Sequence, residues 1–235
     1  MDLYYNLYVF FFTIINYGSG PGQARQGAAR GEIMHKVIAI NRQSGSGGAY
    51  IGAKAAEELG IICYDKQLIQ MSLDHAKMEY SEHAEIFSEA DEKRPNLAFY
   101  RRYSEGDLVD VNPSEAMFEL ERNFLRDAAK NEDMIVVGRC GAHIFEEIED
   151  VNVLSVCIVA SKDFRIKRVM DESGMSENKA ERFVEKTDQQ RSDYYYYITK
   201  QHWNNMESYQ LVLNSEKLGI DNCVKMICAC FRNYL

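Results

Sequence analysis

The residues with the most obvious chemical use form a glycine-rich segment, NRQSGSGGA, at positions 41–49. It follows an apolar run and precedes a helical pattern, so its backbone amides can meet the N-terminus of a helix at one point. Glycines allow a ligand to approach that point without Cβ clashes. The segment therefore predicts a phosphate-binding loop, with a plain strand-to-helix turn as the alternative.

A dinucleotide-binding loop is one candidate for this segment. It would begin at Gly45-x-Gly47 and would need a third Gly or Ala at position 50, where the chain has Tyr50. Asp65 does follow Gly45 by twenty residues, at the end of a predicted strand, as the carboxylate of such a site should. The match to this motif is partial.

A Walker A loop is the other candidate, and the chain departs from it at three positions. Arg42 stands where the pattern has its first Gly, Gly48 where it has the Lys, and Ala49 where it has the Ser or Thr that binds magnesium. Only the inner residues, 44–47, keep the pattern. Spacing alone leaves both candidates open.

Apolar runs separated by helical patterns predict the elements that hold this loop. Each run is continuously apolar, which is typical of parallel strands covered on both faces. Helical spacing at 49–59 ends at Gly60, and a second helix is expected to begin with Ser114 as its N-cap. An α/β fold with a five-stranded parallel sheet follows. Its strands are expected at 36–40, 61–64, 134–137, 153–159 and 210–213.

The apolar faces of two helices follow from the same spacing. The helix near Ser114 would place four apolar residues on one face, and the last helix of the chain would place five there. We expect both faces to pack on the sheet. They comprise Met117, Leu120, Phe124 and Ala128 in the first helix, and Cys223, Ile227, Cys230, Phe231 and Tyr234 in the last.

Two long polar stretches contribute no predicted strand. Residues 66–113 are rich in Glu and Tyr, and residues 161–208 are densely charged with helical spacing. Both follow predicted strands, so they should overhang the carboxyl ends of the sheet, where open α/β sheets bind ligands. They are candidate lids.

Composition limits the class of protein. The 235 residues are 46% hydrophobic and include 36 Asp and Glu against 27 Lys and Arg, a formal charge of −9. That balance argues against a surface for nucleic acid or anionic lipid, so any anion site must be local. The six cysteines form no CxxC pair and the five histidines no Cys/His cluster. We therefore expect reduced, buried thiols, a cytoplasmic protein and no protein-held metal site.

The first 33 residues are expected to lie outside the folded domain. Residues 3–17 are apolar and aromatic, but they are too short for a spanning helix and lack the basic start of a signal peptide. A flexible segment rich in Gly, Ala, Gln and Arg then leads to Met34. We predict an N-terminal extension over 1–33 and one domain over 34–235, with a membrane anchor or signal as the alternative.

Five motifs occur in order along the chain. They are VIAINRQSGSGGAYIGAKAAEELGIICYDKQLI (37–69), IVVGRCGAHI (135–144), ASKDFRIKRV (160–169), KTDQQRSDYYYYIT (186–199) and YQLVLNSEKLGID (209–221). Together they resemble the cytidylate kinase-like family, a divergent branch of the nucleoside monophosphate kinases. The resemblance covers nearly all of 36–233 and implies a P-loop core with an acceptor-binding insertion at 66–113 and a helical lid at 161–208.

The same resemblance implies an activity. It implies transfer of the γ-phosphoryl group of ATP to a nucleoside monophosphate, typically CMP or dCMP, with Mg²⁺. Such a transfer needs little covalent chemistry, because the protein positions donor and acceptor in line and neutralises the negative charge between them. The expected partners are therefore nucleotides, and neither a nucleic acid polymer nor a membrane is expected.

The resemblance also assigns residues to the donor phosphates. Arg42 would supply the charge that a Walker lysine normally brings, and the alternative is a solvated loop arginine. The donor-phosphate loop itself would comprise Ser44, Gly45, Ser46, Gly47 and Gly48.

Two residues match the acceptor side of the family. Asp65, after the second strand, would help build the acceptor and magnesium environment, or it would cap a helix at 66–71. Arg139 resembles the arginine that contacts the acceptor phosphate, and the alternative is an exposed arginine past a strand end.

The charged stretch contributes four more candidates by resemblance. Arg165 and Arg168 match lid arginines that close over the triphosphate. Arg191 would hold the transferring phosphate, where a bidentate guanidinium is suited to the task, and Asp188 would orient Arg191 or bind the acceptor. The alternative for each is a surface ion pair of little energetic value.

The tyrosines at 194–197 and Trp203 are expected to pack the lid against the core, because four successive residues cannot share one helix face. Base stacking is the alternative for them. The prediction for the whole chain is a cytoplasmic, magnesium-dependent nucleoside monophosphate kinase in which Arg42, Arg139, Arg168 and Arg191 converge. A nucleotide-binding regulatory protein and a kinase of another small acceptor are the alternatives.

Overall fold

The computed structural model describes residues 34–65, 100–104, 107–111, 113–146, 148 and 150–233. All of them belong to the unit Met34–Leu235. The predicted N-terminal extension, the helix predicted at 66–71 and most of the predicted acceptor-binding insertion lie outside the described residues.

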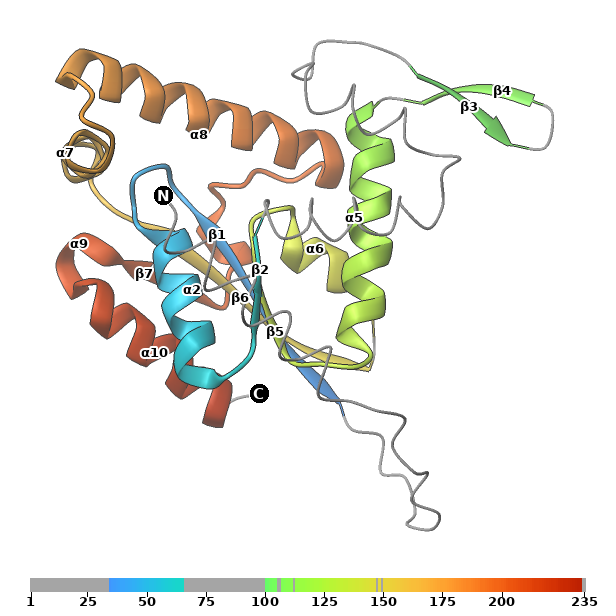
Figure 1. Ribbon diagram of the computed structural model, residues 1–235, viewed down its shortest axis with the longest axis horizontal. Coiled ribbons are helices and arrows are strands. Elements are labelled where there is room, and N and C mark those ends of the chain that lie inside the picture. The colour runs from blue at the N-terminus through green and yellow to red at the C-terminus, as the bar shows by residue number, and fades with distance from the viewer. Residues whose placement is uncertain are drawn as a thin grey trace. The chain divides into compact units, whose positions relative to one another are not determined.

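A five-stranded sheet forms the centre, and all of its strands are parallel (Figure 1). The strand order is β2-β5-β1-β6-β7, with Ile38 of β1 paired to Ile135 on one side and Leu154 on the other. The predicted α/β fold is confirmed. Two strands are longer than expected because β1 and β6 continue to pair beyond their apolar centres. The strands are β1 His35–Arg42, β2 Ile62–Tyr64, β5 Met134–Val137, β6 Val151–Val159 and β7 Leu211–Asn214.

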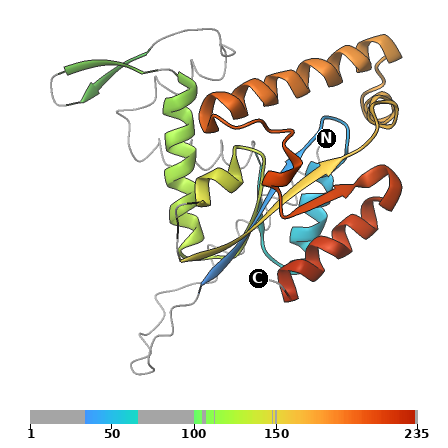
Figure 2. The same ribbon diagram turned by 180° about the vertical axis from the view of Figure 1, so that it is seen from behind.

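Helices cover both faces of this sheet (Figure 1 and Figure 2). On one face, Ile38 packs in a buried cluster with Ile227 of α10. On the other, Val37 packs in a second cluster with Leu125 of α5. Successive residues of a strand point to opposite faces, so β1 contributes to both cores. The helices are α2 Gly48–Leu59, α5 Pro113–Ala129, α6 Gly141–Phe145, α9 Ser215–Leu218 and α10 Ile220–Asn233.

Two helices differ in detail from the sequence prediction. The N-cap prediction for Ser114 is wrong, because α5 begins at Pro113. Proline suits the first helical position, where an amide hydrogen would have no partner within the helix. In α10, Val224 and Cys228 complete the buried face, whereas Cys230 is only half-buried. Tyr234 lies outside the described residues.

The charged stretch 161–208 forms two helices, α7 (Lys162–Ser173) and α8 (Glu177–Thr199), so its helical pattern is confirmed as far as Thr199. Ile166 and Val169 of α7 form a small core with Ala180 and Val184 of α8. Beyond α8 the chain is irregular apart from a 3₁₀ turn at Met206–Ser208. None of the helices in the described part of the chain is long and apolar enough to cross a membrane.

The expectation that 66–113 contains no strand is wrong. β3 (Tyr100–Ser104) and β4 (Asp107–Val111) pair as an antiparallel ribbon, with Tyr100 opposite Val111. Tyr and Val favour strands, and only Glu105 and Gly106 separate the two runs, a spacing typical of a tight hairpin. Charged residues interrupt both segments, so neither segment is a continuous apolar run of the kind that predicts a buried strand.

The order of the strands places the loop after β1 beside the loop after β5. β1 and β5 are neighbours, and both are parallel, so their carboxyl ends lie at one edge of the sheet. The chain leaves β1 through α2 toward β2, while β6 and β7 lie on the other side of β1. Such a point of divergence is where open α/β sheets bind ligands.

Candidate active site

The glycine loop, Ser44–Gly48, connects β1 to α2 in the way the sequence predicts. Gly45 and Gly47 have φ values of 78° and 80°, a left-handed conformation that favours glycine. Gly47 is also the N-cap of α2, and no side chain of the described residues caps this helix. The amides of the first turn of α2 are therefore directed to the same point as the loop, where they can bind an anion.

Side-chain hydrogen bonds fix the loop in this conformation. The Ser46 Oγ atom donates to the Gln43 carbonyl at 2.8 Å, and Ser215 Oγ donates to the Ser46 carbonyl at 2.7 Å. Ser44 and Ser46 are both buried. The loop therefore offers backbone amides to a phosphate, while the hydroxyls of Ser46 and Ser215 hold its backbone.

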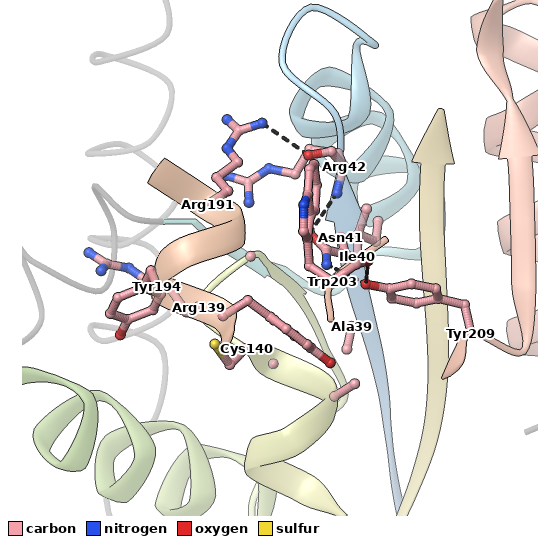
Figure 3. A pocket seen from close by; sticks show the side chains of 14 residues that line it. Ala39, Ile40, Asn41, Arg42, Arg139, Cys140, Arg191, Tyr194, Trp203 and Tyr209 are labelled. Carbon is pink, nitrogen blue, oxygen red and sulfur yellow. Dashed lines mark hydrogen bonds between the residues drawn. The ribbon is translucent and has the colours of Figure 1, made fainter. Parts of the chain in front are cut away.

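Three of the predicted arginines line one pocket beside the loop (Figure 3). Arg42 comes from the end of β1, Arg139 from the segment after β5, and Arg191 from α8. The Arg191 Nη1 atom donates to the backbone carbonyl of Arg42 at 3.0 Å. The pocket also contains Cys140, Asn41 and a group of aromatic side chains.

Positive charge accumulates in this pocket. The pKa of Arg42 falls to about 9, mainly because the group is buried and then because Arg191 and Arg139 lie nearby. Burial also lowers the pKa of Arg191. Both remain protonated at neutral pH. Within the described residues, no carboxylate lies at ion-pair distance from Arg42 or Arg191, and the buried Nε atom of Arg42 has no hydrogen-bond partner.

Arg139 differs from its two neighbours because a carboxylate holds it. Its Nη2 atom lies 3.0 Å from Oε1 of Glu121, a residue of α5 with 0% exposure. Gly138, Arg139 and Cys140 all have positive φ, which turns the chain sharply between β5 and α6. The sequence analysis missed Glu121. Its signal is an acidic residue among Met117, Leu120 and Phe124, on the apolar face of α5.

Arg165 and Asp188 form a buried bridge to the glycine loop. Nη1 of Arg165 lies 2.5 Å from Oδ2 of Asp188 and donates to the Ser44 carbonyl at 3.1 Å. The other carboxylate oxygen of Asp188 accepts from the Ser44 amide at 2.7 Å. Gly45 packs on the same bridge, since a Cβ atom there would lie 2.5 Å from the Arg165 carbonyl. The structure thus places both residues against the loop backbone.

Arg168 does not join the other three arginines, so the expected convergence of four is wrong in this respect. It is not among the residues that line the pocket, and its guanidinium lies against Gly47, 3.1 Å from a Cβ atom built there. There it pairs with Glu172 at 2.8 Å and lies over the Tyr50 ring. The reason is its position on α7, which passes the N-terminus of α2 rather than the end of β5.

Among the described residues, no cluster of metal-ligating side chains near the loop could hold magnesium by itself. Ala49 has no hydroxyl for the metal, and the described residues contain no group of three or more His, Cys, Asp or Glu side chains. Asp65 directly follows β2, and its charge partly offsets the lowering of the Arg42 pKa. Magnesium typically binds proteins through few carboxylates and substrate phosphates. The ion would accordingly enter with the nucleotide.

The aromatic residues after Arg191 pack as predicted, with one exception. Tyr195 and Trp203 are buried in the core on the α5 face, and Tyr194 packs against it. Tyr209 accepts a hydrogen bond from Asn41 at 2.5 Å and donates to the Trp203 carbonyl at 2.6 Å. The exception is Tyr196, which is exposed and stacks on a histidine.

None of the cysteines is paired, as the sequence predicts, and five of the six are buried. Burial raises the pKa of Cys63, Cys140 and Cys157 to about 12. A thiol with such a pKa stays protonated at neutral pH and is a poor nucleophile. Cys140 therefore lines the pocket as a small apolar group.

Comparisons with known structures agree with the fold. An uncharacterised protein from Eubacterium ventriosum shares 24% identity, covers 85% of this chain and 99% of its own, and superposes with a TM-score of 0.63. A Thermus thermophilus protein gives 14% identity, coverages of 86% and 98%, and a TM-score of 0.50. Shikimate kinase from Bacteroides thetaiotaomicron shares 15% identity, covers 84% of this chain and 98% of its own, and superposes with a TM-score of 0.47. Curated protein sequences give no significant match.

A comparison with profiles of protein families identifies the family of this chain. The profile of the cytidylate kinase-like family matches residues 37–217, which include the glycine loop, the three arginines of the pocket and the two charged helices. The sheet order and the helices on both faces agree with that match. The chain therefore belongs to the cytidylate kinase-like family.

Proposed function

We propose that the protein transfers the γ-phosphoryl group of ATP to a nucleoside monophosphate, with CMP or dCMP as the acceptor. The observation that carries this proposal is the pair Arg42 and Arg191, two half-buried cations beside the glycine loop with no carboxylate at ion-pair distance among the described residues. Neighbouring charges of one sign that are partly withdrawn from water cost free energy unless a counter-ion neutralises them. A polyphosphate supplies that counter-ion.

Each part of the site has a task in this reaction. The amides of the glycine loop and of α2 hold the donor phosphates, and Arg42 and Arg191 neutralise the charge that spreads over the transferring group. Arg139, held by Glu121, binds the acceptor phosphate. An acceptor oxygen then attacks the γ-phosphorus, the bond to the bridging oxygen breaks, and ADP leaves. Magnesium, bound to ATP, shields its phosphate charges.

A second function competes with this one. Gly48 and Ala49 lack the lysine and the hydroxyl of a Walker A loop, which favours a protein that binds nucleotides for regulation without turnover. A kinase of another small acceptor is a variant of the first proposal. All three functions use the same donor loop, so the identity of the acceptor, or the lack of one, distinguishes them.

One experiment separates these functions. The full chain is incubated with MgATP and each nucleoside monophosphate in turn, with non-nucleotide sugars and hydroxy acids as further acceptors, and ADP release is followed. We expect turnover with CMP or dCMP. Turnover only with a non-nucleotide acceptor would reassign the substrate, whereas tight ATP binding without turnover on any acceptor would overturn the kinase proposal in favour of the regulatory one.

A further inference from the structure

Two positions of the glycine loop differ from a Walker A loop in opposite ways. The pattern has a glycine at its first position and a cation at its seventh. This chain has a cation, Arg42, at the first position and a glycine, Gly48, at the seventh. Either departure alone would change the charge of the loop. The two together leave one cation in it.

The structure shows why the two departures occur together. A Cβ atom built on Gly48 would collide with the Cβ atom of Arg42 and would lie 2.9 Å from its Cγ atom. Real Cβ atoms essentially never approach other heavy atoms closer than 3.0 Å. Gly48 lies in the first turn of α2, and its φ is not positive. The backbone would accept any residue there, so the main obstacle is the Cβ atom of Arg42. The Cβ atom of Ile158, at 3.3 Å, is a second tight neighbour.

The Arg42 side chain continues from Gly48 over a second glycine. Its guanidinium lies against Gly138, where a built Cβ atom would collide with Nη1 and lie 2.9 Å from Cζ. The side chain therefore passes over Gly48 at its base and over Gly138 at its tip, and reaches the pocket that contains Arg191 (Figure 3). Both glycines leave room for one cation.

We infer that positions 42 and 48 exclude each other, and that Arg42 is the phosphate-binding cation of this loop, carried by the end of β1 instead of the start of α2. This inference rests on the proposed function for the identity of the phosphate, which is that of ATP. The exclusion itself rests only on the packing. A lysine added at position 48 would not supplement Arg42 but displace it.

A comparison of the wild type with three variants tests whether a lysine at position 48 can take the place of Arg42. The full-length wild type, Arg42→Gly, Gly48→Lys and the double variant are compared for the rate of phosphoryl transfer and for the dissociation constant of MgATP. We expect each single variant to lose about 100-fold in rate, since each removes or displaces a cation that neutralises phosphate. The double variant should be at least tenfold faster than Arg42→Gly. Wild-type activity in Gly48→Lys, or no gain in the double variant, would overturn the inference.

A smaller substitution tests the exclusion without any activity. Gly48→Ala should lower Tm by about 5 °C in the wild type and by clearly less in an Arg42→Gly background, where only the 3.3 Å approach to the Ile158 Cβ atom remains. Ala49→Lys, at an exposed position of the same turn, is the control and should leave Tm unchanged. Equal effects of Gly48→Ala in both backgrounds would refute the exclusion. If the wild type binds ATP but phosphorylates no acceptor, the proposed function fails, while the Tm and ATP-binding comparisons still decide this inference.

Discussion

The two sides of the glycine loop use arginine in different ways. On the α7 side, Arg165 bonds to Asp188 and to the carbonyls of Ser44 and Ala160. On the β5 side, Arg42 and Arg191 face other guanidiniums, and within the described residues neither lies at ion-pair distance from a carboxylate. Removing one partner of a paired charge leaves the other partner uncompensated, whereas a cation with no carboxylate at ion-pair distance is available to neutralise a ligand anion.

The largest effect should come from the unpaired side. We expect Arg191→Ala to lower kcat/KM by about 10²–10³, equivalent to about 3–4 kcal/mol of transition-state stabilisation, because a cation at the transferring phosphate is lost. Tm should change little, since the substitution also removes repulsion of Arg42. Rate assays and thermal unfolding of the same samples measure both quantities.

The matched control for this variant is Arg182→Ala, which removes an exposed arginine from the same helix. It should affect neither quantity. A comparable loss of rate in Arg182→Ala would mean that the overall charge of α8, rather than Arg191, supports the reaction.

The paired side should instead lose stability. Arg165→Ala leaves the Asp188 carboxylate, which is 19% exposed, without its guanidinium, and we expect the free energy of unfolding to fall by about 3 kcal/mol. Urea unfolding of Arg165→Ala, Asp188→Ala and the double variant measures their coupling. If the single losses simply add and each stays below about 0.5 kcal/mol, the pair is an ordinary surface pair and the contrast between the two sides is lost.

Gly60 and Gly138 have similar backbone conformations but different surroundings. Replacing each with alanine therefore separates the effect of backbone strain from that of steric crowding. Gly60→Ala, at φ 68° with no heavy atom within 4 Å, should lower the free energy of unfolding by about 1 kcal/mol through the backbone alone. Gly138→Ala, at φ 81°, also displaces the Arg42 guanidinium, so we expect a further loss of about tenfold in rate. Equal rates in the two variants would show that the position of Arg42 is unimportant.

The smallest expected effect is on the pH dependence of stability, and it concerns a carboxylate at the start of α7, on the side of the loop where the charges are paired. The Glu216 carboxylate accepts from the Ser161 amide at the start of α7, and hydrogen bonds from Ser161 hold its pKa below the ordinary value of 4.5. A carboxyl whose pKa is lower in the folded state stabilises the fold above pH 4.5, and this stabilisation is lost as the pH falls further. Thermal unfolding between pH 7 and pH 3 should therefore show a slightly weaker pH dependence for Glu216→Gln than for wild type. An identical dependence would contradict this.

Most of the fold could be predicted from the sequence because its signals are local. The strands are short apolar runs, such as 134–137, and Gly60 ends α2 where predicted. The β3–β4 ribbon escaped prediction because Arg and Asp interrupt its strands, and pairing between strands, which the sequence does not display, stabilises it.

The site could be predicted only as a set of residue types. Arg165 and Arg191 both occur on charged helices, three residues from another charge, and the sequence does not distinguish them. Their difference lies in burial and in partners distant along the chain, Ser44 for one and Arg42 for the other. For the same reason Glu121 was missed, since its partner Arg139 is eighteen residues away on another element.

The length of α8 has a mechanical consequence. Its 23 residues contain no Gly or Pro, so it is a straight rod of roughly 34 Å. Tyr195, near one end, is fixed in the core of the sheet, whereas Ala180 and Val184, toward the other end, pack with α7. Any tilt therefore pivots near Tyr195, about 6 Å from Arg191 and about 27 Å from Glu177. A swing of several ångströms at the far end would move the base of Arg191 by about 1 Å, so the arginine would stay aimed at the loop.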